Sequence, residues 1–195
     1  MKRLLILAFS LSLAACSNSV SSLKYTPSTA IVPVAQSTIS GVSAVDRRKE
    51  EPTRLATVMG GFGNPLKTLD TASPVSEEVA AAFAEGLRQR GMLAADGHAP
   101  FRLVLTVHKM DADMIIGRTA RLDFTMDVVN AAGKTVYEDT AVDSVSDEKF
   151  FQTGVFADIN DLLVMSDTVL SRTIDRMLDK PAFRQAIDGL TGAAS

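Results

Sequence analysis

Residues 121–129, RLDFTMDVV, alternate between polar and apolar side chains. Successive side chains of an extended chain point to opposite faces, so this stretch has one apolar and one polar face. The apolar set is Leu122, Phe124, Met126 and Val128, and the polar set is Arg121, Asp123, Thr125 and Asp127. The pattern predicts an antiparallel strand with one side on a core and the other in solvent.

Further strands are predicted on both sides of this stretch. Residues 101–109 place Phe101, Leu103, Leu105 and Val107 on one face, and residues 135–142 follow a short turn at 130–134. Residues 38–45 and 54–59 also read as strands. The charged run 46–51 and Pro52 lie between them, so we expect these two strands to form a hairpin.

Two long helices and one short helix complete the pattern. Ser73 and Pro74 mark a helix start with serine as the cap, and Val79, Phe83 and Leu87 recur every four residues before Gly91 ends the helix. A second helix is capped by Asp158 or Asn160 and runs to about residue 178. A shorter helix begins at Pro181 and is closed by Gly189.

The order of these elements predicts an α+β fold with two layers. We expect a mixed, largely antiparallel sheet of about five strands, with two main helices packed on one of its faces. Residues 37–195 are expected to form this single domain, because 195 residues suit one domain plus an N-terminal extension.

The N-terminal residues have the features of an export signal. Lys2 and Arg3 precede an apolar run at 4–13, which is too short for a bilayer core that needs about 20 residues. The run ends in Leu-Ala-Ala-Cys at residues 13–16, which resembles the bacterial lipobox. This resemblance implies removal of residues 1–15 as a signal peptide and lipid attachment, including palmitate, at Cys16. Ser17 after the cysteine resembles the sorting signal of outer-membrane lipoproteins.

Cys16 is the only cysteine, so lipidation would account for it and no internal disulfide is possible. Several buried acyl chains anchor a protein stably, at about 0.8 kcal/mol per methylene. Residues 16–36 are serine-rich, include Pro27 and Pro33 and lack periodicity. They predict a lipidated cysteine followed by a flexible tether. The alternative interpretation is a strand near residues 30–35 that lies along the domain.

Charge argues against a nucleic-acid partner. The formal net charge is −3, and it falls to about −5 without Lys2 and Arg3. An acidic domain lacks the basic patch that phosphate backbones require. The one apolar run is at the N-terminus, so we expect membrane attachment through the lipid at Cys16 alone.

No motif for catalysis, a metal or a cofactor is complete. The loop at 60–65, GGFGNP, lacks the Lys-Ser or Lys-Thr of a phosphate-binding loop and is expected to be a turn. His98 and His108 are the only histidines, too few for a zinc site without carboxylate partners. Asp111 and Asp113 begin like a calcium loop, but isoleucines follow where oxygen ligands are needed. We therefore expect no catalytic residues, no metal and no cofactor.

Several stretches together resemble the YajG family of outer-membrane lipoproteins. They are the lipobox at Cys16, the segment from Gly41 to Arg48, the helix end LRQRG at 87–91, the strand LVLTV at 103–107 and the amphipathic helix near the C-terminus. The resemblance covers most of the mature chain, with residues 50–69 matching poorly. It implies a lipid-anchored protein that faces the periplasm, and no catalytic positions are carried over from it.

The sequence thus favours a non-catalytic interaction or accessory module in the bacterial envelope. The polar sheet face is the candidate contact surface for another envelope protein; its residues are His108, Arg121, Asp123, Thr125 and Asp127. The alternative is a carrier of a lipid or a cell-wall fragment, with a groove between sheet and helices. Met92, Met110, Met114, Ile115 and Ile116 would line such a groove, and the equal alternative is that they fill the core.

Overall fold

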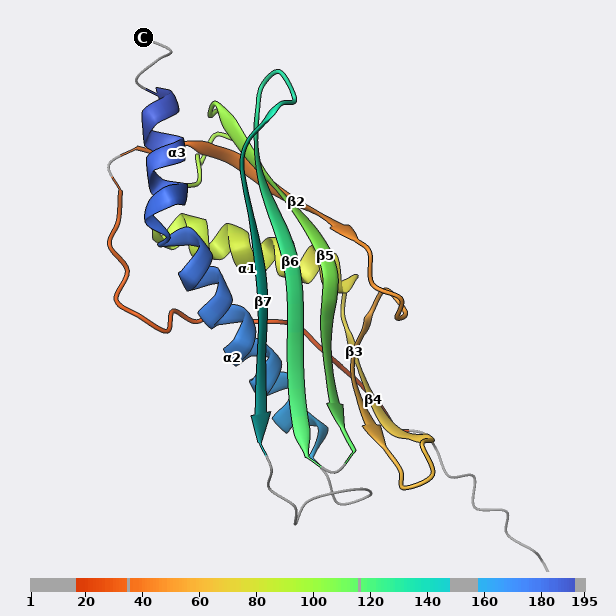
Figure 1. Ribbon diagram of the computed structural model, residues 1–195. Helices are drawn as coiled ribbons and strands as arrows, with labels where there is room; N and C mark the ends of the chain where they lie inside the picture. The colour runs from red at the N-terminus through yellow and green to blue at the C-terminus, as the bar shows by residue number, and fades with distance from the viewer. Residues whose placement is uncertain (1–16, 35, 116, 148–157, 192–195) are drawn as a thin grey trace, which may run out of the picture.

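The computed structural model describes residues 17–34, 36–115, 117–147 and 158–191 (Figure 1). One mixed sheet forms one layer, and the helices pack against a single face of it. The strands are β1 (Ser17–Ser21), β2 (Ile39–Asp46), β3 (Arg54–Met59), β4 (Pro65–Thr71), β5 (Phe101–Met114), β6 (Arg118–Asn130) and β7 (Thr135–Asp147). The helices are α1 (Val75–Gln89), α2 (Ile159–Leu178) and α3 (Pro181–Thr191).

The α+β class and the packing of the helices on one face agree with the prediction, but the sheet is larger than expected. It has seven strands in the order β1-β4-β3-β5-β6-β7, and β2 also pairs with β5. Three pairings are parallel (β1 with β4, β2 with β5, β3 with β5) and three are antiparallel (β3 with β4, β5 with β6, β6 with β7). The mixed character of the sheet agrees with the prediction, but the number of about five strands was too low, because β1 and β4 were not predicted.

These pairings determine which loops share an end of the sheet. Strands β2, β3, β5 and β7 run in one direction, and β1, β4 and β6 run in the other. Ser17 therefore lies at the same end as the β3–β4 hairpin and the β5–β6 turn, which we call the β1 end. The start of β5 and the β6–β7 turn lie at the far end (Figure 1).

The expected β2–β3 hairpin does not form. Both strands instead run parallel to β5 and share one edge of it: β2 pairs with residues 101–107, and β3 pairs with residues 112–114. Between these two pairings, β5 has backbone groups that no strand covers. The charged run 46–51 is therefore not a hairpin turn but the crossing from one half of that edge to the other.

Arg48 fills the gap between β2 and β3. Its side chain is fully buried, and its guanidinium is held by Asp46, with Nη2 2.9 Å from Oδ2. Nη1 donates to the carbonyl oxygens of Arg54 (2.8 Å) and Met110 (3.2 Å), and Nη2 donates to that of Pro52 (2.8 Å). Arg48 thus donates to backbone carbonyls along the edge that neither β2 nor β3 covers, where a buried group without a partner costs about 1–3 kcal/mol. The Pro52 carbonyl also accepts from the backbone amide of Val75 at 2.8 Å.

The described residues of the predicted tether lie along the domain. Strand β1 pairs with β4, and the backbone amides of four following residues donate to side chains on α1 and α2. The pairs are Leu23 to Glu78 (3.2 Å), Lys24 to Asp167 (2.9 Å), Thr26 to Ser171 (3.0 Å) and Ser28 to Asp175 (2.6 Å). Residues 17–34 are therefore not a flexible spacer. The sequence of this segment does not show its attachment, because it is held by its backbone amides. These amides donate to side chains of α1 and α2, whatever the residues of the segment are.

The core lies between the sheet and the two long helices. Helix α2 crosses β3 to β7, and α1 packs on β2 and β5. Phe83 of α1 meets Phe124 of β6 edge to face, with ring centroids 6.2 Å apart. Gly86 lets the helices approach closely, since a Cβ there would lie 2.7 Å from Cγ2 of Ile174. None of the helices in the described part of the chain is long and apolar enough to cross a membrane.

The helix starts agree only in part with the predicted caps. Of the two predicted candidates, Asp158 caps α2, and its side chain accepts a hydrogen bond from the Asn160 amide at 2.9 Å. Ser73 does not cap α1; its hydroxyl instead donates to Oε1 of Glu78 at 2.7 Å. The N-cap position of α1 is Pro74, which cannot bond through its side chain.

A buried ionic network joins the C-terminal ends of α1 and α2. Arg90 is fully buried, and its guanidinium donates to Asp175 at 2.8 Å and to Asp179 at 2.6 Å. It also donates to the hydroxyl of Tyr25 at 2.8 Å, and that hydroxyl donates to Asp175 at 2.6 Å. The network therefore fixes the N-terminal segment to both helices.

Candidate functional site

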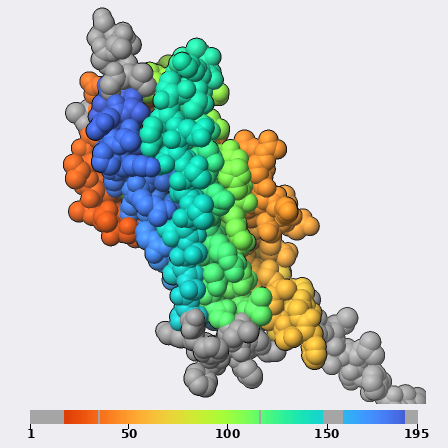
Figure 2. Space-filling model, viewed as in Figure 1, coloured from red at the N-terminus to blue at the C-terminus, as the bar shows by residue number. Residues whose placement is uncertain are grey.

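The candidate site is the sheet face that the helices leave open. In Figure 1, β5, β6 and β7 pass in front of α1, and Figure 2 shows the surface of these strands with no helix over it. Side chains alternate along β6 as predicted, with the apolar set buried. Arg121, Asp123, Thr125 and Asp127 are half-buried on the open face.

His108 and Thr125 meet on this face. The imidazole Nε2 of His108 lies 3.0 Å from the Thr125 hydroxyl. The β5–β6 register shifts between Val107 and Lys109, so His108 sits in a bulge. Both His108 and Lys109 are exposed as a result, which interrupts the strict alternation of β5.

Arg121 is paired across the strands with two aspartates. Its guanidinium donates to Asp113 and, at 3.3 Å, to Asp111. The hydrogen bond to Asp113 outweighs the opposing effect of burial and raises the pKa of Arg121 above its usual range. Asp111 and Asp113, which resembled the start of a calcium-binding loop, thus form ion pairs with Arg121.

The remaining carboxylates of β6 are less well compensated. In the described part of the chain, Asp123 and Asp127 have no hydrogen-bond or ion-pair partner. Asp123 lies opposite Lys109 in the β5 register, whereas Asp127 lies directly opposite Glu138 of β7. Like charges in opposed positions destabilise a strand pair by about 0.2–1 kcal/mol. A basic partner would relieve this repulsion.

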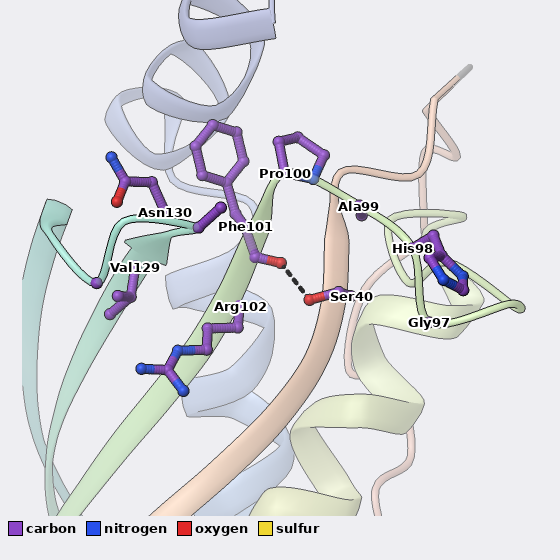
Figure 3. A pocket seen from close by; sticks show the side chains of 11 residues that line it. Ser40, Gly97, His98, Ala99, Pro100, Phe101, Arg102, Val129 and Asn130 are labelled. Carbon is purple, nitrogen blue, oxygen red and sulfur yellow. Dashed lines mark hydrogen bonds between the residues drawn. The ribbon is translucent and has the colours of Figure 1, made fainter.

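A hollow of about 560 Å³ lies at the far end of the sheet (Figure 3). It is bounded by the start of β5, the loop with His98 and the β6–β7 turn. Ser40 donates to the carbonyl oxygen of Phe101 at 2.8 Å. The side chains of Arg102 and His98 point to opposite sides in Figure 3, so these two polar groups do not converge on one point.

A second hollow of about 410 Å³ adjoins the open face near the β1 end. Asp111 and Asp113 contribute to its wall, and these are the carboxylates that hold Arg121. Its lining residues are Glu50, Arg54, Thr57, Met59, Pro65, Asp111, Ala112, Asp113 and Ile115. A third hollow, of about 290 Å³, lies between the N-terminal segment and α2.

The groove expected for a small-ligand carrier is filled by its own residues. Met92, Met110 and Met114 belong to the hydrophobic core and line none of these three hollows. Ile115 is exposed, and Ile116 lies outside the described residues. The methionines therefore fill space in the core.

The other chemical motifs fall into ordinary structural roles. The glycine loop is a turn, as predicted: the Gly60 amide donates to the Asn64 carbonyl and the Gly63 amide to the Gly60 carbonyl. Gly63 has φ +78°, a conformation that favours glycine. Across the ranges that the structure describes, no three His, Cys, Asp or Glu side chains are grouped to hold a metal ion.

Sequence reasoning placed the open-face residues on the correct side but missed the buried charges. Arg48 stands in a mixed run of charges, and Arg90 follows a helix end where basic residues are common. Neither position carries a local signal of burial. Cys16 lies outside the described residues.

The sequence model of one protein family, described as an uncharacterized lipoprotein, matches residues 26–188. No curated protein matches the chain. Among solved structures, protein XCC0632 from Xanthomonas campestris superimposes with a TM-score of 0.58 at 13% identity, over 92% of this chain and 100% of that one. This likeness concerns the fold alone.

Two further solved structures are more distant. A crystal structure described only as an uncharacterized protein has a TM-score of 0.47 at 6% identity, covering 84% of this chain and 98% of that one. The PelC dodecamer from Paraburkholderia phytofirmans has a TM-score of 0.44 at 11% identity, covering 75% of this chain and 92% of that one.

Proposed function

The chain belongs to the family of uncharacterized lipoproteins matched above, and from that membership we propose that it is a non-catalytic interaction module of the bacterial envelope. In this proposal residues 1–15 are a signal peptide, and Cys16 carries the lipid. The protein is held in the outer membrane and faces the periplasm. Its open sheet face binds another envelope protein through His108, Arg121, Asp123, Thr125 and Asp127.

The observation that carries the proposal is the open face itself. The helices cover only one side of the sheet, and its other side mixes half-buried polar groups with exposed valines. Val142 of β7 is 70% exposed beside Asp123, its cross-strand neighbour. Apolar side chains ringed by polar groups are typical of protein contact surfaces.

The charges on this face favour a basic partner. Asp127 faces Glu138, and Asp123 has no ion-pair partner among the described residues, whereas Arg121 is already neutralised by Asp111 and Asp113. A partner that brings lysines or arginines would pair with the two uncompensated aspartates. Such contacts chiefly increase the association rate and the specificity.

The test is photo-crosslinking in cells with the native lipidated protein. A crosslinking amino acid replaces Val142 on the open face or, as a matched control, Val164 on α2, which is 62% exposed. We expect capture of one envelope protein from position 142 and not from position 164. Equal capture from both positions would contradict the proposed face.

Charge reversal then tests the role of the carboxylates. Asp123→Lys should reduce capture from position 142 at least about tenfold, which corresponds to a loss of about 1.4 kcal/mol of binding free energy. Asp96→Lys, an exposed position in the loop before His98, serves as the control for added charge. Unchanged capture with Asp123→Lys would remove this residue from the contact surface.

A further inference from the structure

The N-terminal chain reaches the sheet without a spacer. Strand β1 begins at Ser17, which pairs with Lys67 of β4, and Ser17 directly follows Cys16 in the sequence. Consecutive Cα atoms are about 3.8 Å apart across a trans peptide bond. A lipid on Cys16 would therefore lie one peptide bond from the paired part of β1, at the β1 end.

The same end carries the most exposed apolar side chain of the described chain. Phe62, at the tip of the β3–β4 hairpin, is completely exposed, and this hairpin projects at the lower right of Figure 2. Its loop contains three glycines and one asparagine besides Phe62, with no charged residue between Met59 and Leu66.

A second apolar tip lies beside the hairpin. Ile115, at the end of β5, is 57% exposed and lines the same hollow as Met59 and Pro65. The pairing of Val58 with Met114 explains this proximity, because it brings the ends of β3 and β5 together. Phe62 and Ile115 therefore belong to one apolar rim at the β1 end.

The charges near this rim are compatible with a lipid headgroup layer. Asp111 and Asp113 are the nearest carboxylates on β5, and both are paired with Arg121. Asp111 also lies 3.7 Å from the ammonium of Lys109, so two cations balance these two carboxylates. Glu50, which lines the same hollow, is the remaining carboxylate beside the rim. An uncharged hairpin tip can enter the interface without leaving a bare charge in a medium of low polarity.

We propose that the apolar rim, Phe62 and Ile115 with Met59 and Pro65, rests in the surface of the membrane that holds the Cys16 lipid. This inference depends on the lipidation of Cys16 in the proposed function and adds the orientation of the domain. Burial of a phenylalanine side chain contributes about 1.5–3 kcal/mol to such a contact. The sheet then stands up from the membrane with its far end in the periplasm and its open face accessible from the side.

The chain contains no tryptophan, so an introduced tryptophan reports on one site alone. Phe62→Trp places the probe in the rim, and Ala131→Trp places it in the exposed β6–β7 turn at the far end. Each full lipidated protein is reconstituted into vesicles of phosphatidylethanolamine and phosphatidylglycerol. We expect the emission at position 62 to shift to shorter wavelength and to be quenched by lipids brominated in their acyl chains, whereas position 131 should behave as in water.

The mass of the N-terminal peptide shows whether Cys16 is acylated. This measurement distinguishes a failure of the lipid anchor from a failure of the proposed orientation. An acylated Cys16 with equal, water-like emission at positions 62 and 131 would overturn the orientation and leave the lipid anchor intact. An unacylated Cys16 would overturn the anchor and the orientation with it. Quenching at both positions would also contradict the inference, because the domain would then lie flat or without a preferred orientation.

Discussion

Arg90 and Asp175 form an ion pair that solvent does not reach: Nη2 and Oδ1 are 2.8 Å apart, and the side chains are 0% and 5% exposed. Arg90 follows the last turn of α1, and Asp175 lies near the end of α2. The pair therefore joins the two helices that cover the sheet. Because neither charge is hydrated, each depends on the other and on the hydrogen bonds around it.

Arg90→Ala should lower the free energy of unfolding by about 3–5 kcal/mol, because it leaves Asp175 buried without its cation. The matched control is Arg88→Ala, two residues earlier, where the side chain is exposed and, among the described residues, pairs with Glu85 alone. Urea unfolding measured by circular dichroism compares the two variants with the wild type. Similar midpoints for both variants would show that the buried pair does not hold the helices together.

The same carboxylates make the stability depend on pH. Burial alone would raise the pKa of Asp175, but hydrogen bonds from Ser28, Tyr25 and Arg90 outweigh it and hold the pKa below its usual value. For Asp179, the hydrogen bond from Arg90 is the main cause of a lowered pKa. A depressed pKa in the folded protein gives stability that is complete above the pKa of the unfolded chain and disappears as pH falls through the folded value.

We therefore expect the free energy of unfolding to fall as the pH drops below about 4, the usual pKa of an aspartate. In Asp175→Asn this dependence should be weaker, since one of the two carboxylates is gone, and the stability at neutral pH should be lower. Urea unfolding at a series of pH values from neutral to acidic provides the measurement. Parallel profiles for the variant and the wild type would show that Asp175 does not contribute to the linkage.

Tyr25 fixes the N-terminal segment to the helices. Burial, reinforced by the hydrogen bond to Asp175, raises the pKa of Tyr25 to about 12, so its hydroxyl remains a donor at physiological pH. Tyr25→Phe should weaken the attachment of this segment by about 1–3 kcal/mol, because it leaves buried partners unsatisfied. Trypsin cleavage after Lys24 in the native protein should then become faster. Val32→Ala, at an exposed position of the same segment, should leave the cleavage rate unchanged.

Arg48 and Arg47 provide a second matched pair. Arg48→Ala removes the donor that serves the carbonyls of Arg54 and Met110 at the sheet edge, and it should cost about 1–3 kcal/mol of stability. Arg47 is exposed, so Arg47→Ala should change the stability by about 0.5 kcal/mol or less. Hydrogen exchange should also show faster opening of β2 and β3 in Arg48→Ala. Equal stability of the two variants would refute the role of Arg48 at the sheet edge.

The sequence predicted those parts of the fold in which side chains alternate or recur with a clear period. The side assignments of Leu122, Phe124 and Met126 are confirmed, as is the cap at Asp158. The polar residues of β6 lie on the open face as expected, and their role as a contact surface stays a prediction. Strand β1 has the sequence SNSVS, which shows no apolar alternation. It was therefore missed, since backbone pairing with β4 determines its position.

Tertiary contacts decided the remaining features. The burial of Arg48 depends on the junction of two strands on one edge of β5, and that of Arg90 on the crossing of two helices. The residue pattern of a short sequence segment does not indicate which distant strands or helices come into contact. The predicted hairpin between β2 and β3 failed for the same reason: a charged run before a proline indicates a turn but does not indicate which strand becomes the partner.

The parallel pairing of β1 with β4 also has a mechanical consequence. A pull on the N-terminus acts along the axis of β1, because the strand starts at the β1 end and runs away from it. Residues 17–21 of β1 form five residue pairs with β4. Under such a pull, these pairs bear the load together in shear and do not break one after another, as they would in peeling. The edge of the sheet at which the chain enters the domain is thus the edge built to resist tension.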